Sequence, residues 1–187
     1  DPGRPRRRGF AGARTAGALN TNATILIADD HPLFREALKG SVARVHPGAR
    51  LVEADSTEAL YAMAEAHPDA DLLLLDLNMP GAQGYSALVH LRATQPQLPV
   101  IVVSAREEPN VMRRALDHGA AGFIPKSSDA DTIRDAIATV LGGGTWSPPA
   151  AREAEGAQRA DLVPACHHRD RHGVVDQEQA DDQGDPG

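Results

Sequence analysis

The stretch LLLLDLNMPG, residues 72–81, places four consecutive leucines directly before an aspartate and a Pro-Gly turn. An uninterrupted apolar run of this kind is typical of a strand that is buried on both faces, as in a parallel sheet. Four further short apolar runs lie on either side of it, at 24–28, 51–54, 100–103 and 122–124. We therefore expect five strands in one parallel sheet.

Segments with the apolar spacing of amphipathic helices separate these runs. They cover 32–46, a segment opening at 55–58, 85–94, 110–118 and a segment opening at 128–129. Gly119 follows one of them as a natural C-terminal cap. Five strands that alternate with five helices predict a doubly wound α/β domain.

The composition excludes several broad classes of protein. The chain has 187 residues, of which 41% are apolar and 24% charged, and its net charge is −7. This balance supports a folded core and argues against a generally basic nucleic-acid binder. No apolar run is long enough to span a bilayer. Cys166 is the single cysteine, so we expect no intramolecular disulfide, and we expect a cytoplasmic protein without membrane contact.

The pattern of apolar residues and the distribution of charge divide the chain into three segments. Residues 1–23 hold five arginines and one aspartate and show no strand or helix period, so we expect a disordered basic head. Residues 24–142 carry the α/β pattern. Residues 143–187 are acidic and polar, and we expect a disordered tail without a recognisable DNA-binding domain.

The tail contains one group of residue types that bind zinc, namely Cys166, His167, His168 and His172. His168 and His172 have the i, i+4 spacing of two ligands on one helix face. No second paired cluster accompanies them, and the surrounding sequence has no folded pattern. We therefore favour a solvated tail over a zinc site.

Polar residues follow four of the predicted strands: Asp29 and Asp30 the first, Asp76 the third, Ser104 the fourth and Lys126 the fifth. In open α/β sheets the ligand site lies at the carboxyl ends of the strands, at the topological switch point. We therefore expect three carboxylates, a hydroxyl and an ammonium group at one edge. Each residue alone is more often a cap, a turn or a surface charge, but the joint pattern is hard to obtain by chance.

Three neighbouring carboxylates repel one another unless a cation joins them. Mg²⁺ prefers oxygen ligands and suits one or two carboxylates together with phosphate oxygens. A carboxylate such as Asp76 can also attack a phosphoryl group to form an aspartyl phosphate. A backbone carbonyl of the loop 78–81, which follows Asp76, could complete the metal ligands. The sequence thus indicates a magnesium-dependent phosphoryl site.

Residues 24–142 resemble the receiver domain of two-component response regulators. The resemblance rests on the motifs ILIADDHPLFREAL at 25–38, LLLLDLNMPGAQGYSAL at 72–88, VIVVSA at 100–105 and HGAAGFIPKSS at 118–128. The form DDHPLFR is similar to the LuxR/NarL-type branch, whose members usually join a receiver to a helix-turn-helix DNA-binding domain. The resemblance implies a flavodoxin-like fold, with strand order 2-1-3-4-5 and helices on both faces.

The family's functional residues carry over onto matching positions. The resemblance implies that Asp76 is the phosphoacceptor and that Lys126 contacts the phosphoryl group. Asp30 and Asp76 would bind Mg²⁺ directly together with the Asn78 carbonyl, and Asp29 would act mainly through water. Ser104 would be the switch hydroxyl. Phe123 would be the switch aromatic, with a simple core aromatic as the less favoured alternative.

The resemblance also implies a function and partners. A sensor histidine kinase would donate the phosphoryl group, transcription regulation would be the output of the intact family member, and phosphorylation could drive homodimerisation. DNA would be reached only through an output domain that this chain does not recognisably contain. The protein would be a switch and not a multiple-turnover enzyme.

Two alternatives stand beside this interpretation. The first is a phosphohydrolase with Asp76 as nucleophile. Such an enzyme needs an acid two residues later to protonate the leaving group, and Asn78 at that position cannot donate this proton. The second is an interaction module that works without phosphorylation. Such a module needs no intact acidic site, so the complete set of Asp29, Asp30, Asp76, Ser104 and Lys126 argues against it.

Overall fold

The computed structural model describes residues 22–149. The predicted head, most of the predicted tail and the Cys166–His172 group lie outside the described residues. Five strands and five helices alternate strictly along the described part of the chain. In chain order they are β1 (Thr24–Ala28), α1 (Pro32–Val45), β2 (Arg50–Ala54), α2 (Thr57–Ala66), β3 (Leu72–Asp76), α3 (Ser86–Thr94), β4 (Val100–Ser104), α4 (Pro109–Asp117), β5 (Gly122–Pro125) and α5 (Ala130–Leu141).

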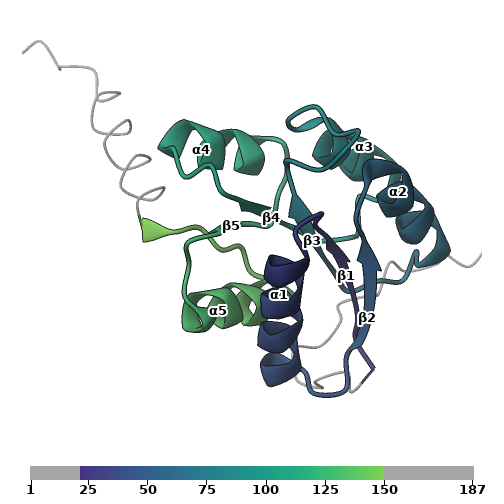
Figure 1. Cartoon of the computed structure of the whole chain (residues 1–187), viewed down its shortest axis with the longest axis vertical. Coiled ribbons are helices and arrows are strands. Elements are labelled where there is room, and N and C mark those ends of the chain that lie inside the picture. The colour runs from purple at the N-terminus through teal and green to yellow at the C-terminus, as the bar shows by residue number, and fades with distance from the viewer. Residues whose placement is uncertain (1–21, 150–187) are drawn as a thin grey trace, which may run out of the picture.

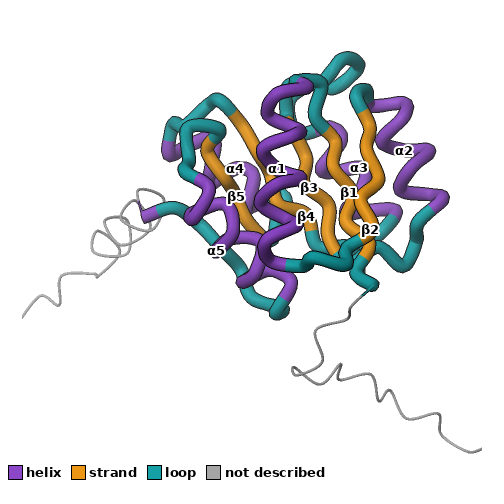
Figure 2. The backbone as a smooth tube through the Cα atoms, turned by 60° about the horizontal axis from the view of Figure 1, so that its bottom comes forward, coloured by secondary structure: helices purple, strands orange, loops and turns teal. Residues whose placement is uncertain are grey.

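All five strands are parallel, in the order β2-β1-β3-β4-β5. Helices α1 and α5 cover one face of the sheet, and α2, α3 and α4 cover the other (Figures 1 and 2). The predicted doubly wound fold and its strand order are therefore confirmed. The helix ends differ from the predicted ones by no more than two residues.

Strand β3 lies at the centre of the sheet, and every one of its residues is buried. Leu73 and Leu75 pack into the core under α2, α3 and α4, whereas Leu72 and Leu74 pack into the core under α1 and α5. Because successive side chains of a strand point to opposite faces, a strand between two helical layers needs apolar residues at every position. This arrangement explains the leucine run.

Strand β2 lies at the edge of the sheet and has a weaker apolar pattern. Its Glu53 side chain forms ion pairs with Arg35 Nε at 2.9 Å and with Lys39 Nζ at 2.9 Å, both from α1. An edge strand with charged residues resists pairing with other chains.

Local sequence signals fix several helix ends. Ser56 Oγ accepts a hydrogen bond from the amide of Ala59 at the start of α2, and Asp129 Oδ1 accepts one from the amide of Thr132 at the start of α5. These side chains satisfy amides that have no partner inside the helix. Gly119 follows α4 with φ of +90°, as predicted for a C-terminal cap.

The described chain continues beyond α5 and returns to the sheet. Trp146 forms a parallel bridge with Gly122, in which its amide donates to the Ala121 carbonyl at 2.9 Å and its carbonyl accepts from the Phe123 amide at 3.2 Å. A Cβ at position 122 would lie 3.1 Å from the Trp146 carbonyl oxygen, a tight contact, so glycine favours the close approach. Our division of the chain after Gly142 stays a prediction; of the residues that follow, the structure places Trp146 at the edge of β5.

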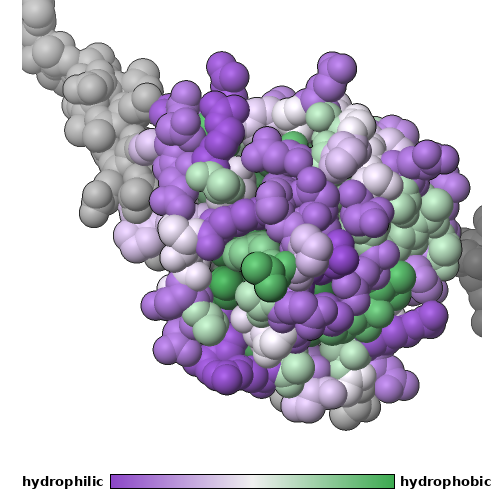
Figure 3. Space-filling view, viewed as in Figure 1, coloured by the Kyte–Doolittle hydropathy of each residue, from purple (hydrophilic) through white to green (hydrophobic). Residues whose placement is uncertain are grey.

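The surface seen in Figure 3 is largely hydrophilic, with a small hydrophobic area near α1. Among the described large apolar side chains, Leu33 in the first turn of α1 is the most exposed, at 88%. None of the described helices has the length and apolar character needed to cross a membrane.

Candidate functional site

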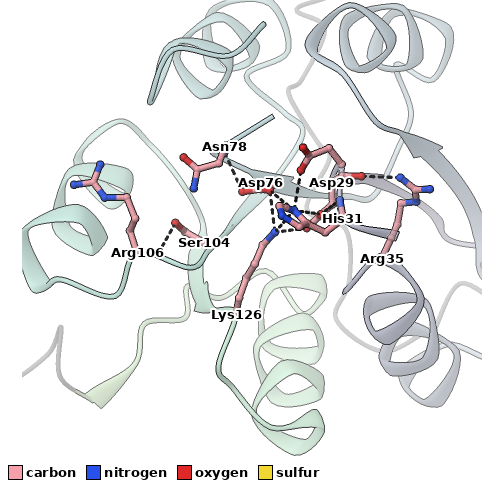
Figure 4. Close-up of polar contacts among 9 residues, drawn as sticks. Asp29, His31, Arg35, Asp76, Asn78, Ser104, Arg106 and Lys126 are labelled. Carbon is pink, nitrogen blue, oxygen red and sulfur yellow. Dashed lines mark hydrogen bonds and ion pairs between the residues drawn. The ribbon is translucent and has the colours of Figure 1, made fainter. Parts of the chain in front are cut away.

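The predicted charged residues meet at one edge of the sheet, where the strands end (Figure 4). Asp29 and Asp30 follow β1, Asp76 ends β3 and Lys126 follows β5. Their side chains form a connected group of short polar contacts, which we call the acidic cluster: Asp29, Asp30, Asp76 and Lys126, together with His31. The expectation that these four predicted residues converge is met.

Lys126 is the cation that joins two of the carboxylates. Its Nζ lies 2.8 Å from Asp76 Oδ2 and 2.9 Å from Asp29 Oδ2. Burial alone lowers the pKa of Lys126, but the hydrogen bonds and charges of Asp76 and Asp29 outweigh burial and raise it overall. Lys126 therefore stays protonated and balances negative charge that would otherwise destabilise the buried site.

Asp29 is fully buried and shapes the turn after β1. Its Oδ1 accepts the amide of His31 at 2.7 Å, and its backbone carbonyl accepts a hydrogen bond from Arg35 of α1 at 2.8 Å. Its Oδ2 pairs with the Lys126 ammonium group at 2.9 Å. The turn thus directs one carboxylate oxygen into the acidic cluster.

Asp76 is 1% exposed and is held by the loop that follows it. Its Oδ1 accepts a hydrogen bond from the Asn78 amide at 3.0 Å. Its Oδ2 faces Lys126 and accepts a hydrogen bond from it. The same loop is hydrogen-bonded to α2. The Pro80 carbonyl accepts hydrogen bonds from the amide and the hydroxyl of Thr57, at 3.1 and 3.0 Å. The loop therefore fixes the direction of the Asp76 carboxylate and positions Asn78 beside it.

Ser104 and Phe123 were predicted to serve a conformational switch. Ser104 is fully buried at the end of β4, and its hydroxyl accepts the Arg106 amide at 3.1 Å instead of joining the ion pairs of the acidic cluster. Its carbonyl accepts the Lys126 amide at 2.8 Å, so it lies directly beside the lysine's backbone. Phe123 is fully buried in β5, in the core under α2, α3 and α4. A switch role for both residues stays a prediction.

Our sequence analysis did not single out His31. Its Nδ1 lies 2.8 Å from Asp30 Oδ1, 3.4 Å from Asp29 Oδ1 and 3.7 Å from Asp76 Oδ2. The residue stands in the quoted motif directly after the two aspartates, and imidazole is a common metal ligand. Both facts were available from the sequence and could have drawn attention to it.

The donor set of the acidic cluster suits a divalent cation. Ligand atoms of Asp29, Asp30, His31 and Asp76 all lie within 4.8 Å of one another. Carboxylate oxygens are the ligands that Mg²⁺ prefers, and three of these four residues supply them. The residues present therefore fit a magnesium ion.

Comparison with known proteins gives a consistent result. The family model described as the response regulator receiver domain matches residues 25–138. The "Glycerol metabolism activator" of Pseudomonas putida is 44% identical over 125 residues, which cover 67% of this chain and 57% of that protein. The "Probable transcriptional regulatory protein NarL" of Mycobacterium tuberculosis is 34% identical over 130 residues, which cover 64% and 60% of the two chains. This chain thus spans a little over half the length of these curated relatives.

Solved structures show the same architecture. The isolated receiver domain of RcsB from Salmonella enterica serovar Typhimurium, determined in the presence of phosphomimetic BeF3−, aligns with a TM-score of 0.64 and 25% identity, over 71% of this chain and 97% of that one. A receiver domain of NarL from Mycobacterium tuberculosis aligns with a TM-score of 0.58 and 33% identity, over 65% and 98% of the two chains. With the matching fold and strand order, these findings show that the chain belongs to the response regulator receiver family, with relatives of the NarL/LuxR type.

Proposed function

We propose that this chain is a phosphorylation switch in which Asp76 accepts a phosphoryl group from the phosphohistidine of a sensor histidine kinase. The observation that carries the proposal is the placement of Asp76. It is a buried carboxylate at the end of the central strand, fixed by the Asn78 amide and lying 2.8 Å from the Lys126 ammonium group.

The transfer is a single displacement at phosphorus. A carboxylate oxygen of Asp76 forms a bond to phosphorus, the bond between phosphorus and the histidine nitrogen breaks, and the nitrogen leaves with the electron pair. Lys126 lies close enough to Asp76 to contact the incoming phosphoryl oxygens as a fixed positive charge. The protein therefore contributes mainly positioning and charge stabilisation.

Asp30, Asp76 and the Asn78 backbone carbonyl would hold the magnesium ion, with Asp29 acting through water. When bound, the ion supplies positive charge against the phosphoryl oxygens and relieves repulsion among the carboxylates. The close packing of ligand atoms from Asp29, Asp30 and Asp76 supports this assignment.

Ser104 and Phe123 are our proposed switch residues. The Ser104 hydroxyl would leave the Arg106 amide for a phosphoryl oxygen, and Phe123 would move into the space it vacates. Ser104 lies on β4 and Phe123 on the neighbouring strand β5, and α4 packs against β5. Phosphorylation would thus bias a two-state surface that includes α4, β5 and α5.

The wider role rests on the family. We propose that residues 24–142 form the receiver, that transcription regulation is the output of the intact family member, and that phosphorylation favours a homodimer. DNA would be contacted only through an output domain. The chain would act in the cytoplasm as a switch and not as a multiple-turnover enzyme.

Binding of beryllofluoride, a phosphoryl mimic, tests the site without a kinase. ¹⁹F NMR of the full chain should show a bound fluoride signal that requires Mg²⁺ and that disappears in Asp76→Asn. The variant Asp69→Asn, at an exposed turn before β3, should retain the signal. A signal of equal strength in Asp76→Asn would exclude Asp76 as the acceptor.

A further inference from the structure

We infer that Arg35 is a positioning residue for the magnesium site: its guanidinium group holds the Asp29 carbonyl and so directs the Asp30 carboxylate to the metal. The inference rests on the proposed function, because it concerns the same metal site. It adds a residue that lies outside the acidic cluster and acts on the metal only through another residue.

The Arg35 side chain connects helix α1 to the turn after β1. Its Nη1 donates a hydrogen bond to the Asp29 carbonyl at 2.8 Å, and its Nε lies 2.9 Å from Glu53 Oε2 on β2. Figure 4 shows the side chain extending from α1 toward the Asp29 carbonyl. The side chain is 21% exposed, so solvent weakens these contacts less than it weakens an exposed ion pair.

The Asp29 carbonyl needs a donor, because Asp29 is fully buried. A buried carbonyl without a partner costs free energy comparable to that of a lost hydrogen bond. The other polar groups of this residue are already held: its amide donates to the Ala54 carbonyl at 3.0 Å, and its Oδ1 accepts the His31 amide at 2.7 Å. The hydrogen bond from Arg35 therefore completes the fixing of the backbone at the end of β1.

The Asp29 carbonyl belongs to the peptide group that joins Asp29 to Asp30. Because a peptide group is planar, a hydrogen bond that fixes this carbonyl also fixes the direction in which the chain enters Asp30. The carboxylates of Asp29 and Asp76 each accept a hydrogen bond from a backbone amide. The Asp30 carboxylate instead contacts the ring of His31, which is 62% exposed. The position of Asp30 therefore depends more on its own backbone than the positions of the other two carboxylates do.

Glu53 orients the guanidinium group of Arg35 from the edge strand. Its Oε2 contacts Arg35 and its Oε1 contacts Lys39, both at 2.9 Å. Arginine presents its donors in a rigid planar fork, so a carboxylate that fixes Nε also fixes the direction of the terminal nitrogens. We therefore expect Glu53 to act on the magnesium site through Arg35, whereas Lys39 pairs with Glu53 and Glu36 at the surface.

The positioning role and a simple charge effect predict opposite results for Arg35. The residue carries a positive charge near the carboxylates, so by Coulomb's law its removal should make the site attract Mg²⁺ more strongly. If Arg35 positions Asp30, its removal should instead weaken Mg²⁺ binding, because the ligand is no longer held in place. A purely structural role would lower the free energy of unfolding and leave the Mg²⁺ affinity of the folded protein unchanged.

NMR titration of the ¹⁵N-labelled full chain with MgCl₂ measures this affinity in wild type, Arg35→Gln, Glu53→Gln and Lys39→Gln. We expect Arg35→Gln to weaken Mg²⁺ binding roughly tenfold, as loss of a residue that orients a metal ligand does, and Glu53→Gln to weaken it by about threefold. Lys39→Gln is the matched control, because it removes the other partner of Glu53, and it should change the affinity by less than about twofold. The dispersion of the amide signals checks that each variant is folded.

Two further measurements separate positioning from other effects. In an Arg35→Gln background, Glu53→Gln should cause no further loss of Mg²⁺ affinity, and an additive loss would overturn the role assigned to Glu53. With acetyl phosphate as donor, Arg35→Gln should raise the Mg²⁺ concentration that gives half the maximal phosphorylation rate and change the rate at saturating Mg²⁺ little. A lower maximal rate with an unchanged Mg²⁺ requirement would overturn the inference.

Unchanged or tighter Mg²⁺ binding by folded Arg35→Gln overturns the inference and leaves the proposed function standing. If Arg35→Gln does not fold, Glu53→Gln decides at high ionic strength, where charge effects are screened. Weaker binding than in Lys39→Gln then supports the inference, and equal binding overturns it. A wild-type protein that binds no Mg²⁺ would overturn the metal site of the proposed function and the inference together.

Discussion

Lys126 Nζ lies 2.8 Å from Asp76 Oδ2, although the two residues are 50 positions apart in the sequence. Asp76 ends β3 and Lys126 directly follows β5; these two strands lie on either side of β4 and end at the same edge of the sheet. A parallel sheet brings such distant residues together because all its strands end on one side. The contact is thus a direct product of the topology.

Removing the ammonium group should destabilise the fold at neutral pH. We expect Lys126→Gln to lower the free energy of unfolding by on the order of 2 kcal/mol, because Asp29 and Asp76 lose their shared cation.

Urea denaturation of wild type and Lys126→Gln at neutral pH measures the difference. The matched control is Lys39→Gln, which removes the only other lysine of the chain, one that pairs with Glu36 and Glu53 at the surface. Exposed ion pairs contribute little, so this variant should differ little from wild type. A loss in Lys126→Gln no larger than the loss in Lys39→Gln would contradict the assigned role.

The same ion pairs predict a loss of stability at alkaline pH. The pKa of Lys126 is raised above its ordinary value of 10.5 in the folded protein. A raised pKa of a basic group contributes stability that is complete below the unfolded pKa and lost as the pH rises through the folded pKa. The stability difference between wild type and Lys126→Gln should therefore be constant up to about pH 10 and shrink above it, as measured by urea denaturation at a series of alkaline pH values. A difference that persists undiminished above the folded pKa would refute the ion pairing.

The leucine run of β3 should carry a large share of the stability. Leu74 is fully buried in the core under α1 and α5, so Leu74→Ala leaves a cavity. We expect a loss of about 2–5 kcal/mol in the free energy of unfolding, measured by chemical denaturation. Val89 on α3 is 47% exposed, and Val89→Ala should cost less than about 1 kcal/mol. Equal losses in the two variants would argue against the assigned burial.

The fold and most of the acidic cluster were predictable from sequence because both follow from simple patterns. Runs such as 72–75 and 100–103 are apolar at every position, which only strands covered on both faces require. Once the strands are parallel, the polar residue after each strand must lie at the common edge. Asp29, Asp30, Asp76 and Lys126 follow from this rule alone.

The parts that escaped prediction depend on packing that no local pattern encodes. The ring of His31 points to the aspartates because of a turn held by Asp29 Oδ1, and the sequence does not show this turn. Trp146 pairs with β5 through its backbone, and a single tryptophan among polar residues carries no strand period. Both features arise from contacts between the end of one element and the edge of another.

Phosphorylation of Asp76 is the central claim, and intact-mass spectrometry of the full chain after incubation with acetyl phosphate tests it most directly. The proteins compared are wild type, Asp76→Asn and Asp69→Asn, each with and without Mg²⁺. We predict a single phosphoryl adduct on wild type and Asp69→Asn that requires Mg²⁺ and is absent from Asp76→Asn. A folded wild-type protein without an adduct, or an adduct that persists in Asp76→Asn, would contradict the account.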